Sequence, residues 1–185
     1  MATMPNLGPT PPDARDIAAA VARVAAALTH EAGPGDLAAL RRLGPHDPST
    51  PAFYRVLVAY VEPHYPLPAS APARDEVEWR WAVILAGMAR LEHRPGRRLG
   101  HAAAEARLAE MRFLRLLRDS GHTLAATFRG VVHFLATKYE PFDWSDGAKL
   151  VLSAGHDWGE SVRRAIARDY YSRSHRLESE KEERS

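Results

Sequence analysis

Apolar residues recur every three or four positions along most of the chain, which is the spacing of one face of an α-helix. The first series comprises Ile17, Val21, Val24 and Leu28 and stops at Gly33-Pro34-Gly35. Asp13 precedes this series as a candidate N-cap. We therefore predict a helix that starts at about residue 13, followed by a short helix in the segment GDLAALRRL, residues 35–43.

The same periodicity predicts helices along the rest of the chain. Pro51 is placed to begin the helix PAFYRVLVAYV, which Pro63 ends. A helix over residues 75–91 carries an apolar stripe of Trp81, Ile84, Leu85 and Met88. Further helices are predicted over residues 99–118, 123–139, 148–154 and 159–171, with Ser145 as a candidate cap for the third of these.

The helix over residues 123–139 shows the pattern most clearly. Its inward face is predicted to consist of Leu124, Phe128, Val131, Val132 and Leu135. No segment alternates with a period of two residues, and no internal repeat is present. The fold class is therefore predicted to be all-α, an irregular bundle of about eight helices.

Length and composition indicate a single domain. The chain has 185 residues, of which 45% are hydrophobic, enough for one substantial core. Residues 1–12 contain four prolines and no periodic pattern, so we expect a flexible leader there. Residues 13–176 form the predicted domain, and the segment LESEKEERS, residues 177–185, is expected to be a flexible acidic tail.

Composition also excludes several classes of protein. The chain has no cysteine, which excludes disulfides and thiolate metal sites and is compatible with a reducing cytoplasm. The N-terminal residues have neither the charge nor the apolar run of a signal peptide. The longest apolar run, residues 81–89, is far shorter than the roughly 20 residues that span a bilayer. We therefore expect a soluble, cytoplasmic protein.

Basic residues are concentrated in the middle of the chain, although the net charge is only +2. Between Arg90 and Arg118 there are eight arginines and three acidic residues. If residues 99–118 form one helix, each residue advances by about 100°. Arg107, Arg112, Arg115 and Arg118 then share one side, with Phe113, Leu114 and Leu117 on the other. Glu110 disagrees with this wheel, because it falls on the apolar side.

Two interpretations of this basic helix face are open. The arginine stems could cover apolar surface while their head groups pair with acids on neighbouring helices. Alternatively, the helix could join the basic turn RPGRRLG and Arg41-Arg42 in a phosphate-binding surface. We favour the second interpretation for the group, because the guanidinium fork matches phosphate oxygens.

No motif of an enzyme or a cofactor site is present. The sequence lacks HExxH, GxSxG, GxGxxG and the phosphate-binding GxxxxGK[ST]. His122 and His133 lie eleven residues apart on one predicted helix, too far for a shared metal ion. We therefore expect no catalytic residue, no metal, no cofactor and no small-molecule substrate.

Five segments in order resemble the CasB family, the small subunit of Cascade, the type I-E CRISPR surveillance complex. They are GDLAALRRL at 35–43, PAFYRVL at 51–57, WAVILAGMA at 81–89, GRRLGHAAAEARLAEMRFLRLLR at 96–118 and PFDWSDGAKLVL at 141–152. The resemblance implies a non-catalytic all-α subunit. Its implied partners are a repeated backbone subunit, the large subunit, a second copy of itself, the guide crRNA and the target and non-target DNA strands.

The resemblance also implies which residues bind nucleic acid. The family's basic positions correspond here to Arg41 or Arg42, to Arg112 and to Arg129 and Lys149. The helix wheel and the basic turn add Arg97, Arg98, Arg115 and Arg118. These residues would hold the guide–target duplex and the displaced strand of the R-loop.

Two other functions remain open on the residues alone. The segment 148–171 could supply the two short helices of a helix-turn-helix regulator, with Arg163, Arg164 and Arg168 at base edges. A helical enzyme without a recognisable motif is the second alternative. A regulator would prefer one duplex sequence, whereas a Cascade small subunit would bind nucleic acid without sequence preference.

Overall fold

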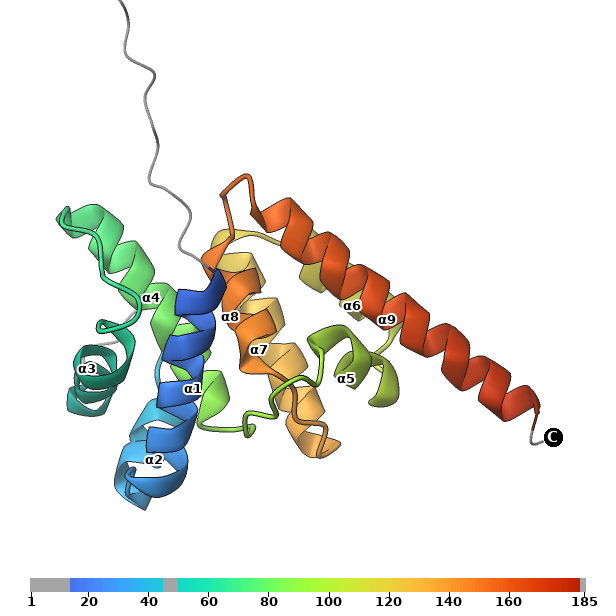
Figure 1. The fold of residues 1–185 in the computed structure, drawn as a ribbon, viewed down its shortest axis with the longest axis horizontal. Coiled ribbons are helices and arrows are strands. Elements are labelled where there is room, and N and C mark those ends of the chain that lie inside the picture. The colour runs from blue at the N-terminus through green and yellow to red at the C-terminus, as the bar shows by residue number, and fades with distance from the viewer. Residues whose placement is uncertain (1–13, 45–49, 184–185) are drawn as a thin grey trace, which may run out of the picture.

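The structure is a computed structural model that describes residues 14–44 and 50–183, with side chains from residue 16. Within these ranges the regular structure is helical, which confirms the predicted all-α class. The predicted leader and the candidate cap Asp13 lie outside the described residues. The helices are α1 (Ala14–His30), α2 (Pro34–Arg41), α3 (Pro51–Val56), the π-helical turn η1 (Leu57–Val61), α4 (Ala71–Met88), α5 (Leu99–Glu105), α6 (Glu110–Arg118), α7 (Gly121–Thr137), α8 (Trp144–Leu152) and α9 (Gly159–Glu182) (Figure 1).

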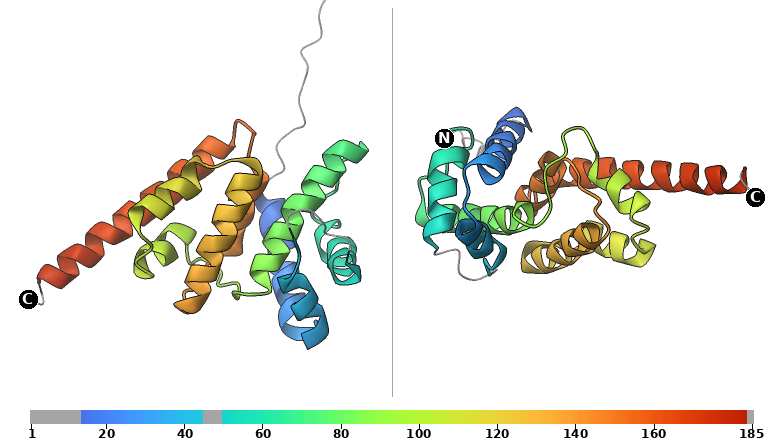
Figure 2. Two further views of the ribbon diagram at one scale, coloured as in Figure 1. Left: turned by 180° about the vertical axis from the view of Figure 1, so that it is seen from behind. Right: turned by 90° about the horizontal axis from the view of Figure 1, so that it is seen from below.

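The helices form two groups joined by α7 and α8. Helices α1 to α4 lie together on one side, and α5, α6 and α9 lie on the other (Figures 1 and 2). Helix α8 contacts α1, α4, α5 and α9, so it links the two groups. None of the helices in these described ranges is long and apolar enough to cross a membrane.

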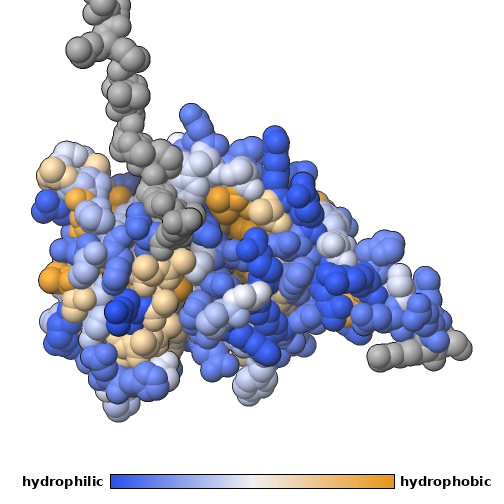
Figure 3. Space-filling model, in the orientation of Figure 1, coloured by the Kyte–Doolittle hydropathy of each residue, from blue (hydrophilic) through white to orange (hydrophobic). Residues whose placement is uncertain are grey.

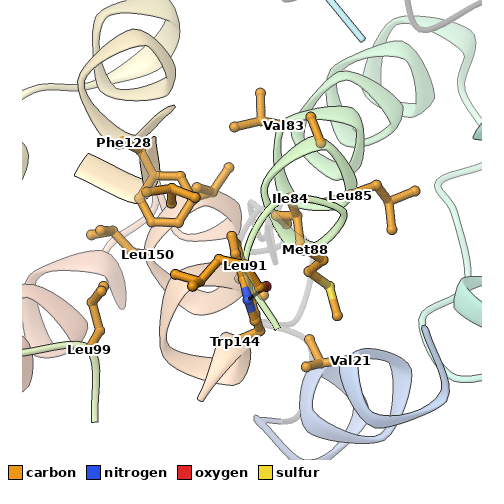
Figure 4. Close-up of a cluster of buried hydrophobic side chains, with 14 of the residues drawn as sticks. Val21, Val83, Ile84, Leu85, Met88, Leu91, Leu99, Phe128, Trp144 and Leu150 are labelled. Carbon is orange, nitrogen blue, oxygen red and sulfur yellow. Dashed lines mark hydrogen bonds between the residues drawn. The ribbon is translucent and has the colours of Figure 1, made fainter. Parts of the chain in front are cut away.

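The core is centred on α4 and α8. Every residue of α4 from Trp79 to Met88 is buried. The indole Nε1 of Trp144, the first residue of α8, donates a hydrogen bond to the Leu91 carbonyl oxygen at 2.8 Å. Its ring packs where a Cβ atom on Gly87 would come within 2.2 Å, so only glycine fits there. Figure 4 shows Trp144 beside Leu91 and Met88 in this core, with Phe128 of α7 across from α4.

The expected helix over residues 99–118 is wrong, because the chain breaks into α5 and α6. Arg107 has a φ of +57° between them, a left-handed conformation that ends α5. Buried Leu108 accepts a hydrogen bond from the Tyr170 hydroxyl on its carbonyl oxygen at 2.8 Å, which holds the break against α9. Glu110 therefore starts a new helix and accepts a hydrogen bond from the Tyr171 hydroxyl at 2.8 Å. The helix wheel applies only within α6.

Other helix ends also differ from the expectation: α4 spans Ala71–Met88 in place of residues 75–91, and the helix after Pro51 divides into α3 and η1. Helix α8 begins at Trp144, because the Asp143 carboxylate, and not Ser145, caps it by accepting the Ser145 amide at 2.9 Å. Helix α9 was expected to end at Tyr171 but continues to Glu182, so residues 177–182 belong to the helix. Its end projects from the body as a hydrophilic extension (Figures 1 and 3).

Gly100 tests the packing of α5 on α9. A Cβ atom there would lie 2.4 Å from the Ile166 carbonyl oxygen and 2.6 Å from the Tyr170 backbone nitrogen, neither of which can give way. We expect Gly100→Ala to lower the free energy of unfolding by about 1–3 kcal/mol in urea denaturation. In the control Gly130→Ala, where nothing lies within 4 Å of the added Cβ, stability should rise by about 0.8–1 kcal/mol. An unchanged stability of Gly100→Ala would contradict this packing.

Candidate nucleic-acid interface

Arg97 is held by carboxylates of neighbouring segments. Its guanidinium forms ion pairs with Glu105 of α5 and with Glu140 after α7, and it donates to the Pro141 carbonyl oxygen at 3.0 Å. Burial alone would lower its pKa, but the two carboxylates outweigh burial and raise it. Arg97 therefore ties the start of α5 to the end of α7.

Arg98 is neutralised in the same way. Its Nε lies 3.0 Å from the Asp169 carboxylate on α9 and 3.4 Å from that of buried Asp146 on α8. Burial raises the pKa of Asp146, and the charge of Arg98 only partly offsets this. The interpretation in which arginines pair with acids of neighbouring helices thus describes Arg97 and Arg98, and we leave both out of the candidate surface.

Three other arginines come together without a carboxylate. Arg41, the last residue of α2, donates from Nε to the Ala89 carbonyl oxygen at 2.6 Å. Arg90, just after α4, donates in return to the Arg41 carbonyl oxygen. Both acceptors are neutral backbone carbonyls, and no acidic side chain of the described ranges forms an ion pair with either arginine.

Arg129 of α7 completes this arginine cluster of Arg41, Arg90 and Arg129. Its side chain is half-buried, and burial together with the nearby charge of Arg90 lowers its pKa. Two like charges near each other, without an acid between them, raise the electrostatic free energy of the free protein. The arginine cluster is therefore a place where an anion would be stabilised.

Two further cations lie where α6 meets α7. The Arg112 guanidinium sits 5.8 Å above the ring centroid of Phe134, and the Lys138 ammonium lies 6.0 Å from the same centroid. Both cations are exposed. The face of the ring attracts both charged groups, which holds the two cations near each other at the surface.

The two groups flank one face of α7. Phe134 lies five positions after Arg129, which places them about 140° apart around the helix. Gly130, His133 and Thr137 lie between them and are exposed. We define the basic surface as the six cations at the rims of this face and at the adjoining end of α2: Arg41, Arg42, Arg90, Arg112, Arg129 and Lys138.

Three other predicted residues, Arg115, Arg118 and Lys149, are not members of the basic surface. Arg115 and Arg118 are exposed on α6, turned about 60° and 120° away from Arg112. Lys149 is half-buried on α8, where its charge opposes the rise in the pKa of Asp146. These three residues share no contact with the arginine cluster within the described part of the chain, and their role stays a prediction.

Sequence reasoning missed Arg90 and Lys138 as members of the surface. Both residues follow the last turn of a helix, so their direction depends on how that helix packs and not on its periodicity. The one available signal was the excess of arginine over acid that begins at Arg90.

One of the three arginines of the helix-turn-helix interpretation is paired with an acid, and a second is partly covered. Arg164 pairs with Glu160 at 2.9 Å, and Arg163 is half-buried and donates toward the Asp119 carbonyl oxygen at 3.4 Å. Arg168 alone of the three stays exposed without an acidic partner among the described residues. Those residues also contain no group of three side chains suited to hold a metal ion.

Comparisons with known proteins agree with this fold. The sequence matches the family model of CRISPR-associated protein Cse2 over residues 36–171. The structure is similar to M. ruber CasB with a TM-score of 0.66 and 21% identity, covering 86% of this chain and 97% of that one. For CasB from Thermobifida fusca the TM-score is 0.64 at 18% identity, with 85% and 96% covered.

A third similar chain belongs to E. coli Cascade bound to a PAM-containing double-stranded DNA target. It has a TM-score of 0.60 and 22% identity, and the match covers 89% of this chain and 97% of that one. At these identities the likeness shows the fold. A comparison with curated proteins gave no match.

Glu105 provides a pH test of the bracing ion pairs. Burial raises its pKa, but hydrogen bonds from Arg97 and Arg173 outweigh burial and lower it. A carboxyl with a depressed pKa stabilises the fold above its unfolded pKa of about 4.3, and this contribution disappears as the pH falls through the folded value. Glu105→Gln should therefore cost roughly 1.5–3 kcal/mol at neutral pH and less in acid, measured by urea unfolding between about pH 7 and pH 3.

The matched control is Glu178→Gln, which changes an exposed glutamate of α9. Its stability should follow that of the unaltered protein at every pH. If Glu105→Gln lost stability equally at neutral and acid pH, the ion pairs would not have the role assigned to them.

Proposed function

The chain belongs to the Cse2 family of CRISPR-associated proteins, and on that premise we propose that it is the small subunit of a type I-E Cascade complex. We propose further that the basic surface binds nucleic-acid backbone in that complex. The partners would be the repeated backbone subunit, the large subunit, a second copy of this chain, the guide RNA and the two DNA strands. The subunit itself would be non-catalytic.

The arginine cluster is the observation that carries this proposal. Arg41 and Arg90 donate hydrogen bonds to backbone carbonyl oxygens, and burial together with the charge of Arg90 lowers the pKa of Arg129. No acidic side chain of the described residues forms an ion pair with any of the three. A phosphate group between Arg90 and Arg129 would remove the repulsion and accept hydrogen bonds from both guanidinium groups. The cations around Phe134 extend the same potential across α7.

Backbone contacts suit the task of a Cascade small subunit. Sequence is read by pairing between guide and target, so the protein has only to hold strands in place. Opening the DNA duplex and forming the heteroduplex nearly balance in free energy, so a few phosphate contacts can decide whether the R-loop stays open. Such binding depends on salt and not on the base sequence.

The test replaces Arg90 and Arg129 together by glutamine in the complete complex. Target-DNA capture should weaken, and the slope of log K against log salt should become shallower by about 1.4 if two single-strand phosphate contacts are lost. The variant subunit should keep its unfolding temperature, because the substitutions also remove a repulsion. Capture can be measured by electrophoretic mobility shift over a series of salt concentrations.

A matched control removes the same charge elsewhere. Arg164→Gln with Arg176→Gln changes two exposed arginines of α9, outside the basic surface. This variant should capture target DNA like the unaltered complex. Equal affinity and equal salt dependence for the Arg90 and Arg129 variant would refute the proposed function.

A further inference from the structure

A hollow opens beside the arginine cluster, between α1, α2 and the ends of α4 and α7. Its volume is about 450 Å³, within the range of roughly 300–1,000 Å³ typical of small-molecule sites. Apolar side chains form most of its wall, among them Leu28, Leu37, Met88 and Ala136. The polar part of its lining includes Arg41, Arg90, Thr29, Glu92 and His93.

Tyr139 stands at the edge of this hollow in an unusual conformation. Its side chain is 89% exposed, and its φ is +54°. It follows the C-cap Lys138 of α7 in a complete Schellman motif, because the Tyr139 amide donates to Ala136 at 3.2 Å and the Glu140 amide to Leu135 at 3.0 Å. Glycine is the usual residue at this position, since a side chain is strained there.

Tyr139 gains little stability from burial, and its backbone conformation is strained. The stability of the folded subunit alone therefore does not explain why a tyrosine is present here. Proteins that bind single-stranded nucleic acids combine an exposed aromatic ring with nearby guanidinium groups. The cations hold the phosphate, and the ring stacks on a base. A base stacked on the tyrosine with one face could contact the apolar wall of the hollow with its other face.

We propose that this hollow receives one unstacked nucleobase, which Tyr139 covers while the neighbouring phosphate lies on the arginine cluster. This inference rests on the proposed function, because the arginine cluster must first bring a strand to the hollow. Its ligand is a nucleotide of a single-stranded segment. Charge favours a nucleic acid over a protein segment, since the lining carries two arginines against one acid, Glu92, and neither arginine forms an ion pair with any acid of residues 14–44 or 50–183.

The fluorescent base 2-aminopurine tests the inference in the complete complex. Its emission is quenched by stacking, so a probe should brighten when its strand is displaced from the duplex. We expect one position to stay quenched because the base stacks on Tyr139. One series of probes runs along the displaced strand and a second along the target strand, which distinguishes the two sources of the base.

Tyr139→Gly is the decisive variant. It should restore emission at the quenched position and weaken capture of target DNA about fivefold or more, the loss expected for one stacked base. Because glycine suits a positive φ, the variant subunit should unfold at the same or a higher temperature. Tyr139→Phe keeps the ring and should keep the quenching.

The remaining outcomes separate the two proposals. If Tyr139→Gly changed emission at no position of either strand, the inference would be overturned. If, in that case, Tyr139→Gly also reduced incorporation of the subunit into the complex, the hollow would hold a partner protein in place of a base. The proposed function fails separately, when the Arg90 and Arg129 variant captures DNA normally.

Discussion

The proposed function depends on three arginines, Arg41, Arg90 and Arg129, which packing and backbone hydrogen bonds hold near one another without an acidic partner among the described residues, so that their mutual repulsion is not relieved. Helix α4 cannot shift to relieve it, since its last ten residues are all buried. Arg90 is further held by its hydrogen bond to the Arg41 carbonyl oxygen. The positive potential is therefore already present in the folded subunit, and an anion that binds there need not first assemble its own site.

The chain uses arginine in two ways, and the position of carboxylates separates them. Arg97, Arg98 and Arg173 meet acids from neighbouring helices and fasten α5 to α8 and α9. The members of the arginine cluster meet backbone carbonyls or one another. The first use explains why arginines so close in sequence to the basic helix face do not join it. The second concentrates charge where α2, α4 and α7 converge, beside the hollow that Tyr139 borders.

Hydrophobic periodicity predicted α7 well, because all five residues expected to face inward are buried there. It failed between α5 and α6, since no glycine or proline marks the turn at Arg107 and a tertiary hydrogen bond from Tyr170 holds it. Arg112 could be assigned to an exposed face from its position alone. Arg90 could not, because the residue after a helix takes its direction from the packing of that helix.

A cryo-electron microscopy map of the complete complex bound to target DNA would test the central claim most directly. The account predicts a phosphate group within hydrogen-bonding distance of the guanidinium groups of both Arg90 and Arg129. A carboxylate from another subunit in that position, or DNA that passes this face of α7 without contact, would contradict it.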